Sequence, residues 1–211
     1  MTMWQGLVGV RADRGYSYRK LEKRADYVRD RLNYSPTDAI DTLRLFDGLG
    51  MEVRDGTGRD IPIHGAVIDL NGSEGYAKYD GDRHVIEILA SPETYDWLEK
   101  GHPRGGFFVA HELGHCLLHT DQLVRLAQMP KAQQAALHRG GEGVGHKAYE
   151  DTEWQANAFA GALLMPARGL LILEQEHGKL SQDIITEHFP VSAEAAGYRL
   201  ELYNDRKEQL L

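Results

Sequence analysis

Two histidines and a glutamate in an apolar stretch, residues 107–119, have the types and the spacing of a metal site. His111 and His115 are four residues apart, so on a helix both side chains project from one face, one turn apart. Two imidazoles placed in this way can bind one zinc ion at Zn–N distances of about 2.0–2.1 Å. Glu112 follows the first histidine and can accept a proton from an attacking water, which is the H-E-x-x-H arrangement of metallopeptidases. The alternative is a chance match in a chain that contains 10 histidines.

A catalytic zinc site needs a third protein ligand, and His119 continues the same four-residue spacing. On a continuous helix with a rise of about 1.5 Å per residue, His119 lies about 12 Å from His111 along the axis. One ion bound at about 2 Å from each ligand cannot reach both rings. We therefore predict that His119 is a partner of a ligand, a substrate contact or a helix-end residue.

A second helical stretch, residues 153–160, offers a better third ligand. Glu153 and Asn157 are four residues apart and face the same way, so the carboxylate can bind the ion while the amide orients another ligand. Ala156 and Ala160 lie on nearly the same face and would let the two helices approach closely. Three further acids are rivals by charge alone: Glu142, Glu150 and Asp151.

The composition is that of a globular protein, and we expect it to bind neither nucleic acid nor a membrane directly. Of the 211 residues, 42% are hydrophobic and 27% are charged. A formal net charge of -8 opposes binding to nucleic-acid phosphates, and no apolar stretch is long enough for a membrane span. The single cysteine, Cys116, excludes an intrachain disulfide and fits a reducing compartment. We expect a cytoplasmic protein in which Cys116 is a small buried apolar group.

The first hundred residues predict a mixture of helices and strands. Residues 11–20 show no periodicity and are predicted to be a loose lead-in. Two amphipathic helices follow, at 21–32 and from Thr37 or Asp38 to about 46. Ser91 and Pro92 begin another short helix. Between these helices, short β-rich runs predict a small antiparallel sheet, at 51–54, 63–70, 75–79 and 83–89.

The second half of the chain is predicted to be mostly helical. A weak helix at 122–137 leads into a glycine-rich stretch, and we interpret residues 120–150 as an insertion near the site. A strong helix occupies 151–164 and ends before Pro166. Two further helical segments are predicted in the tail, with Ser181 and Ser192 as candidate N-caps, at 169–176 and 192–202.

Two motifs in this chain resemble those of the ImmA/IrrE metallopeptidases. The motifs run from His111 to His119 and from Glu153 to Pro166, and the tail from Phe189 to Leu200 is similar to that family's C-terminal helical segment. The resemblance implies a zincin-like fold. It also implies a Zn2+ ion held by His111, His115 and Glu153, with Glu112 as the general base.

The resemblance further implies a substrate class, namely helix-turn-helix repressors of phages, mobile elements or stress regulons. A member of this family would cut its repressor at one site and so release the repressed genes. Two other classes of protein remain as alternatives. One is a non-catalytic binding module that sequesters a repressor or another partner, and the other is a DNA-binding regulator that uses the segment 191–200.

The sequence therefore predicts an α+β, zincin-like zinc endopeptidase. Residues 1–175 are predicted to form the peptidase domain, with its insertion at about 120–150, and residues 176–211 a helical subdomain packed on it. We expect the strand at 83–89 to align an extended substrate by β-augmentation. The donor to the oxyanion is left open among five residues: His119, His138, His146, Tyr149 and Arg199.

Overall fold

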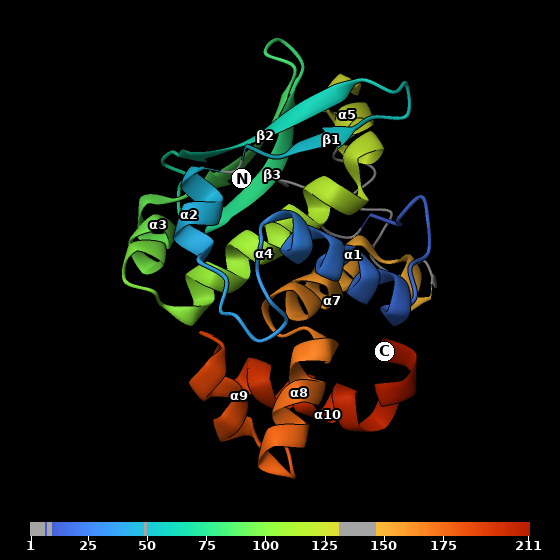
Figure 1. Cartoon of the computed structure of the whole chain (residues 1–211). Coiled ribbons are helices and arrows are strands. Elements are labelled where there is room, and N and C mark those ends of the chain that lie inside the picture. The colour runs from blue at the N-terminus through green and yellow to red at the C-terminus, as the bar shows by residue number, and fades with distance from the viewer. Residues whose placement is uncertain (1–6, 8–9, 49, 131–146) are drawn as a thin grey trace.

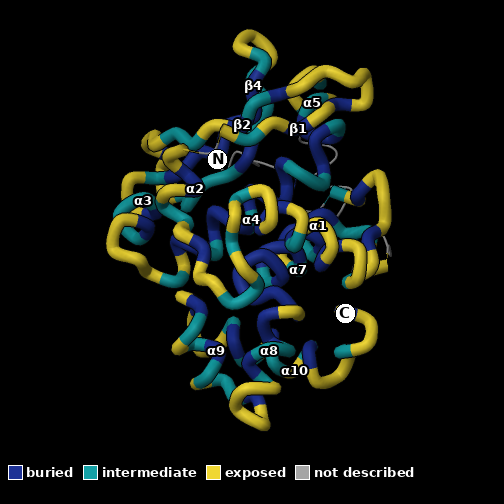
Figure 2. Tube along the Cα trace, viewed as in Figure 1, coloured by how far each residue is buried: buried dark blue, intermediate teal, exposed yellow. Residues whose placement is uncertain are grey.

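A computed structural model describes residues 7, 10–48, 50–130 and 147–211. Its elements form three layers (Figure 1). A small sheet lies at the top, helices α4 (Pro103–Leu118) and α7 (Thr152–Leu164) cross the middle, and α8 (Ala167–His177), α9 (Gln182–His188) and α10 (Ala193–Leu210) lie below. The buried apolar side chains form one cluster from the sheet to α10. Figure 2 shows these buried residues running through the centre of the molecule, between exposed outer turns.

The sheet is mixed, which corrects the antiparallel sheet expected from the sequence. Its strands are β1 (Glu52–Arg54), β2 (Asp60–Val67), β3 (Gly75–Asp80) and β4 (Val85–Ala90), in the order β1-β2-β4-β3. β2 and β4 pair in parallel, whereas the other two pairs are antiparallel. The strand positions were predicted closely. The pairing was wrong because β3 lies on the far side of β4, so the turn at Asn71 and Gly72 does not join neighbouring strands.

β4 lies between β2 and β3, so both of its edges are already paired. Every residue of β4 is buried, as expected for a central strand covered on both faces. The prediction that residues 83–89 align a substrate was therefore wrong, because a paired strand has no free backbone groups to offer. β3 is the edge strand next to α4. A side chain at Gly75 would collide with the Phe108 ring of α4, so only glycine allows this close approach.

α4 and α7 pack closely because small residues meet where they cross. A Cβ added at Gly114 would lie 3.2 Å from the Cα of Ala156 and 3.1 Å from the ring of Phe159. Ala156 and Ala160 are fully buried. The helix predicted at 151–164 and its small-residue face are confirmed.

Shorter helices surround this central pair: α1 (Tyr18–Arg31), α2 (Thr42–Asp47), α3 (Pro92–Glu99), α5 (Thr120–Gln128) and the 3-10 helix η1 (Ala148–Glu150). α3 begins at Pro92, as predicted, and the Ser91 side chain caps it. α2 begins later than the predicted Thr37 or Asp38. The reason is a turn before it, in which Asp38 accepts from the N–H of Ser35 while Arg29 donates to the carbonyls of both residues.

The tail contains one helix more than the two predicted segments, and α10 extends well beyond residue 202. Ser181 and Ser192 cap α9 and α10 as predicted. The proposed domain boundary at 175 falls inside α8, and the division into domains stays a prediction. Within the described part of the chain, no single helix is long and apolar enough to cross a membrane, and α7 with α8 meets that test only as a pair bent by 43°.

A buried ion pair joins α1 to α10. Arg199 donates from Nη2 to Oε1 of Glu22 at 2.7 Å and from Nε to the Met165 carbonyl at 2.8 Å. The second oxygen of Glu22 accepts the N–H of Ala167 at 3.1 Å. Burial raises the pKa of Glu22, even though the Arg199 charge opposes that shift. The pair thus ties α10 to α1 and to the junction between α7 and α8.

We expect Arg199→Met to lower the free energy of unfolding by about 3–5 kcal/mol, because it leaves the Glu22 carboxylate buried without its cation. Urea denaturation of the purified variant measures this change. Asp96→Asn is the control, since it removes an exposed ion pair with Lys100 and should cost at most about 1 kcal/mol. An effect of Arg199→Met as small as that of the control would contradict the structural role of the buried pair.

Candidate metal centre

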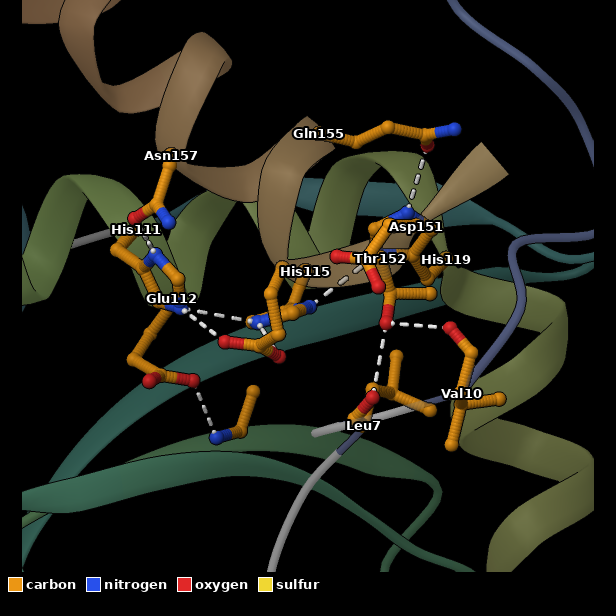
Figure 3. A network of polar contacts seen from close by, with 12 residues as sticks. Leu7, Val10, His111, Glu112, His115, His119, Asp151, Thr152, Gln155 and Asn157 are labelled. Carbon is orange, nitrogen blue, oxygen red and sulfur yellow. Dashed lines mark hydrogen bonds and ion pairs between the residues drawn. The ribbon is translucent and has the colours of Figure 1, made fainter. Parts of the chain in front are cut away.

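The structure brings His111, His115 and Glu153 together, as the sequence predicted. Their ligand atoms all lie within 4.8 Å of one another. The two Nε2 atoms are 3.1 Å apart, and the Glu153 oxygens lie 3.4 Å from His111 Nε2 and 3.1 Å from His115 Nε2. Figure 3 shows both rings on one face of α4, beneath the start of α7.

These residues fit a zinc ion by their chemistry and by their arrangement. Two imidazoles and one carboxylate form the protein ligand set of many catalytic zinc sites, where a fourth position stays open. Oε1 of Glu153 is buried and makes no hydrogen bond within the described part of the chain, although it lies 3.1 Å from His115 Nε2. An unpaired buried carboxylate oxygen is costly, and a cation among these three side chains would offset that cost.

The electrostatics of the cluster favour a charged carboxylate. Burial by itself raises the pKa of Glu153, but its contacts with His111 and His115 outweigh burial and hold that pKa well below its ordinary value. Burial by itself would lower the pKa of His111. The contact with Glu153 and the charge of Glu112 outweigh burial, so the pKa of His111 is raised above its ordinary value. Glu153 is therefore an anion at neutral pH, as a metal ligand must be.

Each histidine has a partner at the ring nitrogen that faces away from the cluster. His111 Nδ1 lies 2.9 Å from Oδ1 of Asn157, so the prediction that Asn157 orients a ligand agrees with the geometry. His115 Nδ1 lies 3.2 Å from Nδ1 of His119. Metal-binding histidines usually have such a partner, which fixes the ring and its tautomer.

His119 lies outside the three-residue cluster, at the residue that ends α4. Its ring is buried, and its Nε2 lies 2.9 Å from Oε1 of Gln155. Burial, reinforced by the neighbouring His115, lowers the pKa of His119 to about 4. The ring is therefore neutral at neutral pH, and among the three predicted roles it fits that of a ligand's partner.

Glu112 is held beside the cluster by the sheet. Its Oε2 accepts the backbone N–H of Ala77 at 2.7 Å, and Figure 3 shows the carboxylate directed from α4 towards this strand. The side chain is buried. Ala77 belongs to β3, so an edge strand fixes the orientation of the predicted general base. No sequence pattern pointed to this contact, because it depends on where β3 lies in the sheet.

The N-terminal segment is attached to the site, which corrects the loose lead-in predicted for residues 11–20. The Thr152 hydroxyl donates to the carbonyls of Leu7 and Val10, each at 2.8 Å. Gln155 donates to the carbonyl of Arg14 at 2.7 Å. These contacts use backbone groups, so the residue types of the segment gave no signal. A buried glutamine on an otherwise apolar helix face was the available clue.

The other candidates from the sequence are placed as follows. Arg199 donates its hydrogen bonds to Glu22 and to the Met165 carbonyl, and neither bond involves a residue of the cluster. Burial raises the pKa of Cys116 well above its ordinary value, as expected for an inert apolar group. Three residues considered above lie outside the described residues: His138, Glu142 and His146.

An apolar groove of about 700 Å³ lies beside the cluster. It runs between the start of α4, the middle of α7 and the start of α10. Asn157, the partner of His111, forms part of its wall, as does Phe107, whose ring contacts that of His111. Further along, the walls include Gly161, Val191 and Tyr198. The groove is therefore separated from His111 by side chains that contact this histidine directly, Asn157 and Phe107.

The residues of the site lie in the part of the chain that matches a known protein family. Residues 99–201 match the profile of a peptidase family, M78, described as the IrrE N-terminal-like domain. Comparison with curated proteins gives no match. Among solved structures, a Mycobacterium tuberculosis transcriptional regulator is similar at 19% identity and a TM-score of 0.45, over 85% of this chain and 45% of that one. The chain thus spans less than half of that regulator's length.

We expect the purified protein to bind about one Zn2+ per chain. Glu153→Gln should lower the Zn2+ affinity by more than about 100-fold, because losing a ligand costs more than the 10–100-fold lost with a residue that only orients a ligand. Competition with a chromophoric zinc chelator measures both. Glu150→Gln is the matched control, because Glu150 is a nearby acid paired instead with the exposed Arg11. Equal losses in the two variants would refute the assignment of Glu153 as the third ligand.

Proposed function

Because residues 99–201 belong to the peptidase family described as the IrrE N-terminal-like domain, we propose that this protein is a zinc-dependent endopeptidase. The resemblance to ImmA/IrrE metallopeptidases, expected from the two motifs, is confirmed over this range. The observation that supports the proposal most directly is the cluster of His111, His115 and Glu153, with Glu112 on the same helix. This is the residue set that zinc-dependent hydrolysis requires.

Glu112 would act as the general base of this reaction. Zn2+ bound at the cluster would polarise the scissile carbonyl and lower the pKa of the attacking water. The Glu112 carboxylate takes the proton from that water and later passes a proton to the leaving amine. The hydrogen bond from Ala77 holds one of its oxygens at 2.7 Å, so the carboxylate is oriented before the substrate binds.

The free edge of β3 is the best place for an extended substrate. Within the described part of the chain β3 pairs with β4 along one edge only. The Ala77 N–H points to Glu112, so the unpaired edge faces the predicted general base. A polypeptide can add to such an edge through backbone hydrogen bonds, which select for an extended chain and are independent of its sequence.

The apolar groove supports a protein substrate with apolar side chains next to the cleaved bond. It adjoins the cluster through Asn157 and Phe107, and its walls are mostly apolar. Side-chain contacts in such a groove give the sequence preference that backbone pairing lacks. We propose that the substrate is a helix-turn-helix repressor, on the basis of the resemblance to ImmA/IrrE peptidases.

We expect Glu112→Gln to keep its Zn2+ while its rate of cleavage falls by about 10²–10⁴-fold, the usual contribution of a general base. The assay uses mass spectrometry to follow cleavage of a helix-turn-helix repressor whose gene lies next to the gene for this protein. Glu99→Gln, at the end of α3, serves as the control and should cleave normally. An intact repressor that co-elutes with the zinc-loaded wild-type protein would instead favour the non-catalytic binding module.

Substitutions at Gly161 test whether the groove binds substrate. No heavy atom of a neighbouring residue lies within 4 Å of a Cβ added there, so a side chain can leave the helix at this position without a clash at its first atom. Gly161→Trp should fill the groove and lower kcat/KM by about 10–200-fold, mainly through KM. Gly161→Ala should keep kcat/KM and stabilise the protein by about 0.5–1 kcal/mol, because alanine is the better helix former. Unchanged cleavage by a folded Gly161→Trp variant would rule out the groove as a substrate site.

A further inference from the structure

Gln155 lies on α7 between the third ligand and Asn157, and its side chain is completely buried. Its Nε2 lies 2.7 Å from the carbonyl oxygen of Arg14 and 2.7 Å from that of Tyr149. Carbonyl oxygens only accept hydrogen bonds, so the atom facing both must be the NH2 group. The orientation of this amide is therefore determined by two backbone carbonyls from separate segments of the chain.

This orientation determines the tautomer of His119. With its NH2 group directed at the two carbonyls, Gln155 presents Oε1 to the Nε2 of His119, at 2.9 Å. An amide oxygen can only accept, so the proton of the neutral His119 ring is on Nε2. Its Nδ1 then carries an unshared electron pair.

The same reasoning extends to His115. The Nδ1 of His115 lies 3.2 Å from the Nδ1 of His119. Since His119 Nδ1 can only accept, Nδ1 of His115 carries a proton, and Nε2 is the His115 nitrogen that remains to bind a metal. That Nε2 is the atom facing His111 and Glu153, and a metal ion binds a histidine nitrogen only through an unshared pair.

We infer that Gln155 is a positioning residue for metal binding, which acts through His119 to hold His115 in the tautomer that can bind a metal. The inference rests on the metal centre of the proposed function. It assigns His119 and Gln155 a joint role: neither is a ligand, and together they connect a ligand to backbone carbonyls in the N-terminal segment and in η1. His111 differs, because Asn157 contacts it directly.

The tautomers can be observed in the metal-free wild-type protein. Long-range 1H–15N correlation spectra of 15N-histidine-labelled protein report which ring nitrogen bears the proton. We expect Nδ1–H for His115 and Nε2–H for His119 at neutral pH. The opposite tautomer on His115 would overturn the inference. This measurement needs no substitution, so it decides the matter even if a variant at Gln155 fails to fold.

The effect on metal binding is tested with Gln155→Met, which keeps the size of the side chain but removes its polar groups. We expect its Zn2+ affinity to fall by about tenfold, the lower end of the range for outer partners of metal ligands. The matched control is Gln122→Met. Gln122 is also buried and also contacts the N-terminal segment, through Arg11 and Asp13, and neither of these hydrogen bonds involves His119. A merely structural role would lower the stability of both variants and leave both Zn2+ affinities unchanged.

Two substitutions at His119 test whether its effect on Zn2+ binding comes from the Nδ1 acceptor or from the size of the side chain. His119→Leu removes the acceptor for His115 and should weaken Zn2+ binding by about 10–100-fold. His119→Asn places an oxygen near the position of Nδ1 and should recover part of that affinity. Equal Zn2+ affinities for the leucine variant and the wild type would overturn the inference. Failure of the wild type to bind Zn2+ would refute the proposed function, while the spectra of the metal-free protein would still decide the tautomers.

Discussion

The close contact between α4 and α7 at Gly114 is the constraint on which the site depends. The two histidines come from one helix and the carboxylate from the other, so the distance between the helices sets the distance between the ligand atoms. A Cβ at Gly114 would lie 3.2 Å from the Cα of Ala156 and 3.1 Å from the ring of Phe159, closer than an ordinary contact, so one of these neighbours would have to shift. A zinc ion needs all its ligands at about 2 Å, which leaves little tolerance for such a shift. The small residues at this crossing therefore help to set the distances between the candidate ligand atoms.

Buried polar side chains around the cluster join this helix pair to the rest of the chain. Glu112 is hydrogen-bonded to β3, and His111 is hydrogen-bonded to Asn157 of α7. His115 contacts His119, His119 contacts Gln155, and Gln155 is hydrogen-bonded to the N-terminal segment and to η1. Buried polar groups must be paired, so these side chains hold one another in single orientations. Segments that are far apart in sequence thus converge on one set of imidazole rings.

The remaining layers shape the surroundings of the centre. The sheet places β3, its edge strand among the described residues, beside Glu112, and α10 forms one wall of the apolar groove. The buried pair of Glu22 and Arg199 holds that wall against α1. A site between a strand edge and an apolar groove is suited to an extended polypeptide, because backbone and side chains are bound by different surfaces.

The sequence by itself determined the local features of this protein. The four-residue spacing of His111 and His115, the partner position of Asn157 and the N-caps at Ser91, Ser181 and Ser192 all follow from helix geometry over a few residues. The rise along a helix that separates His119 from His111 is likewise fixed over a few residues. The third ligand was less certain from spacing alone, and the resemblance to a family strengthened its choice.

Only the tertiary structure decided which distant groups meet. The parallel pairing of β2 with β4, the edge position of β3 and the contact of Ala77 with Glu112 depend on how strands cross in the sheet, and alternation along a strand does not encode that order. The same holds for Gln155, whose partners are backbone carbonyls. Every residue has such a carbonyl, so no residue type could reveal the contact with Arg14 in advance.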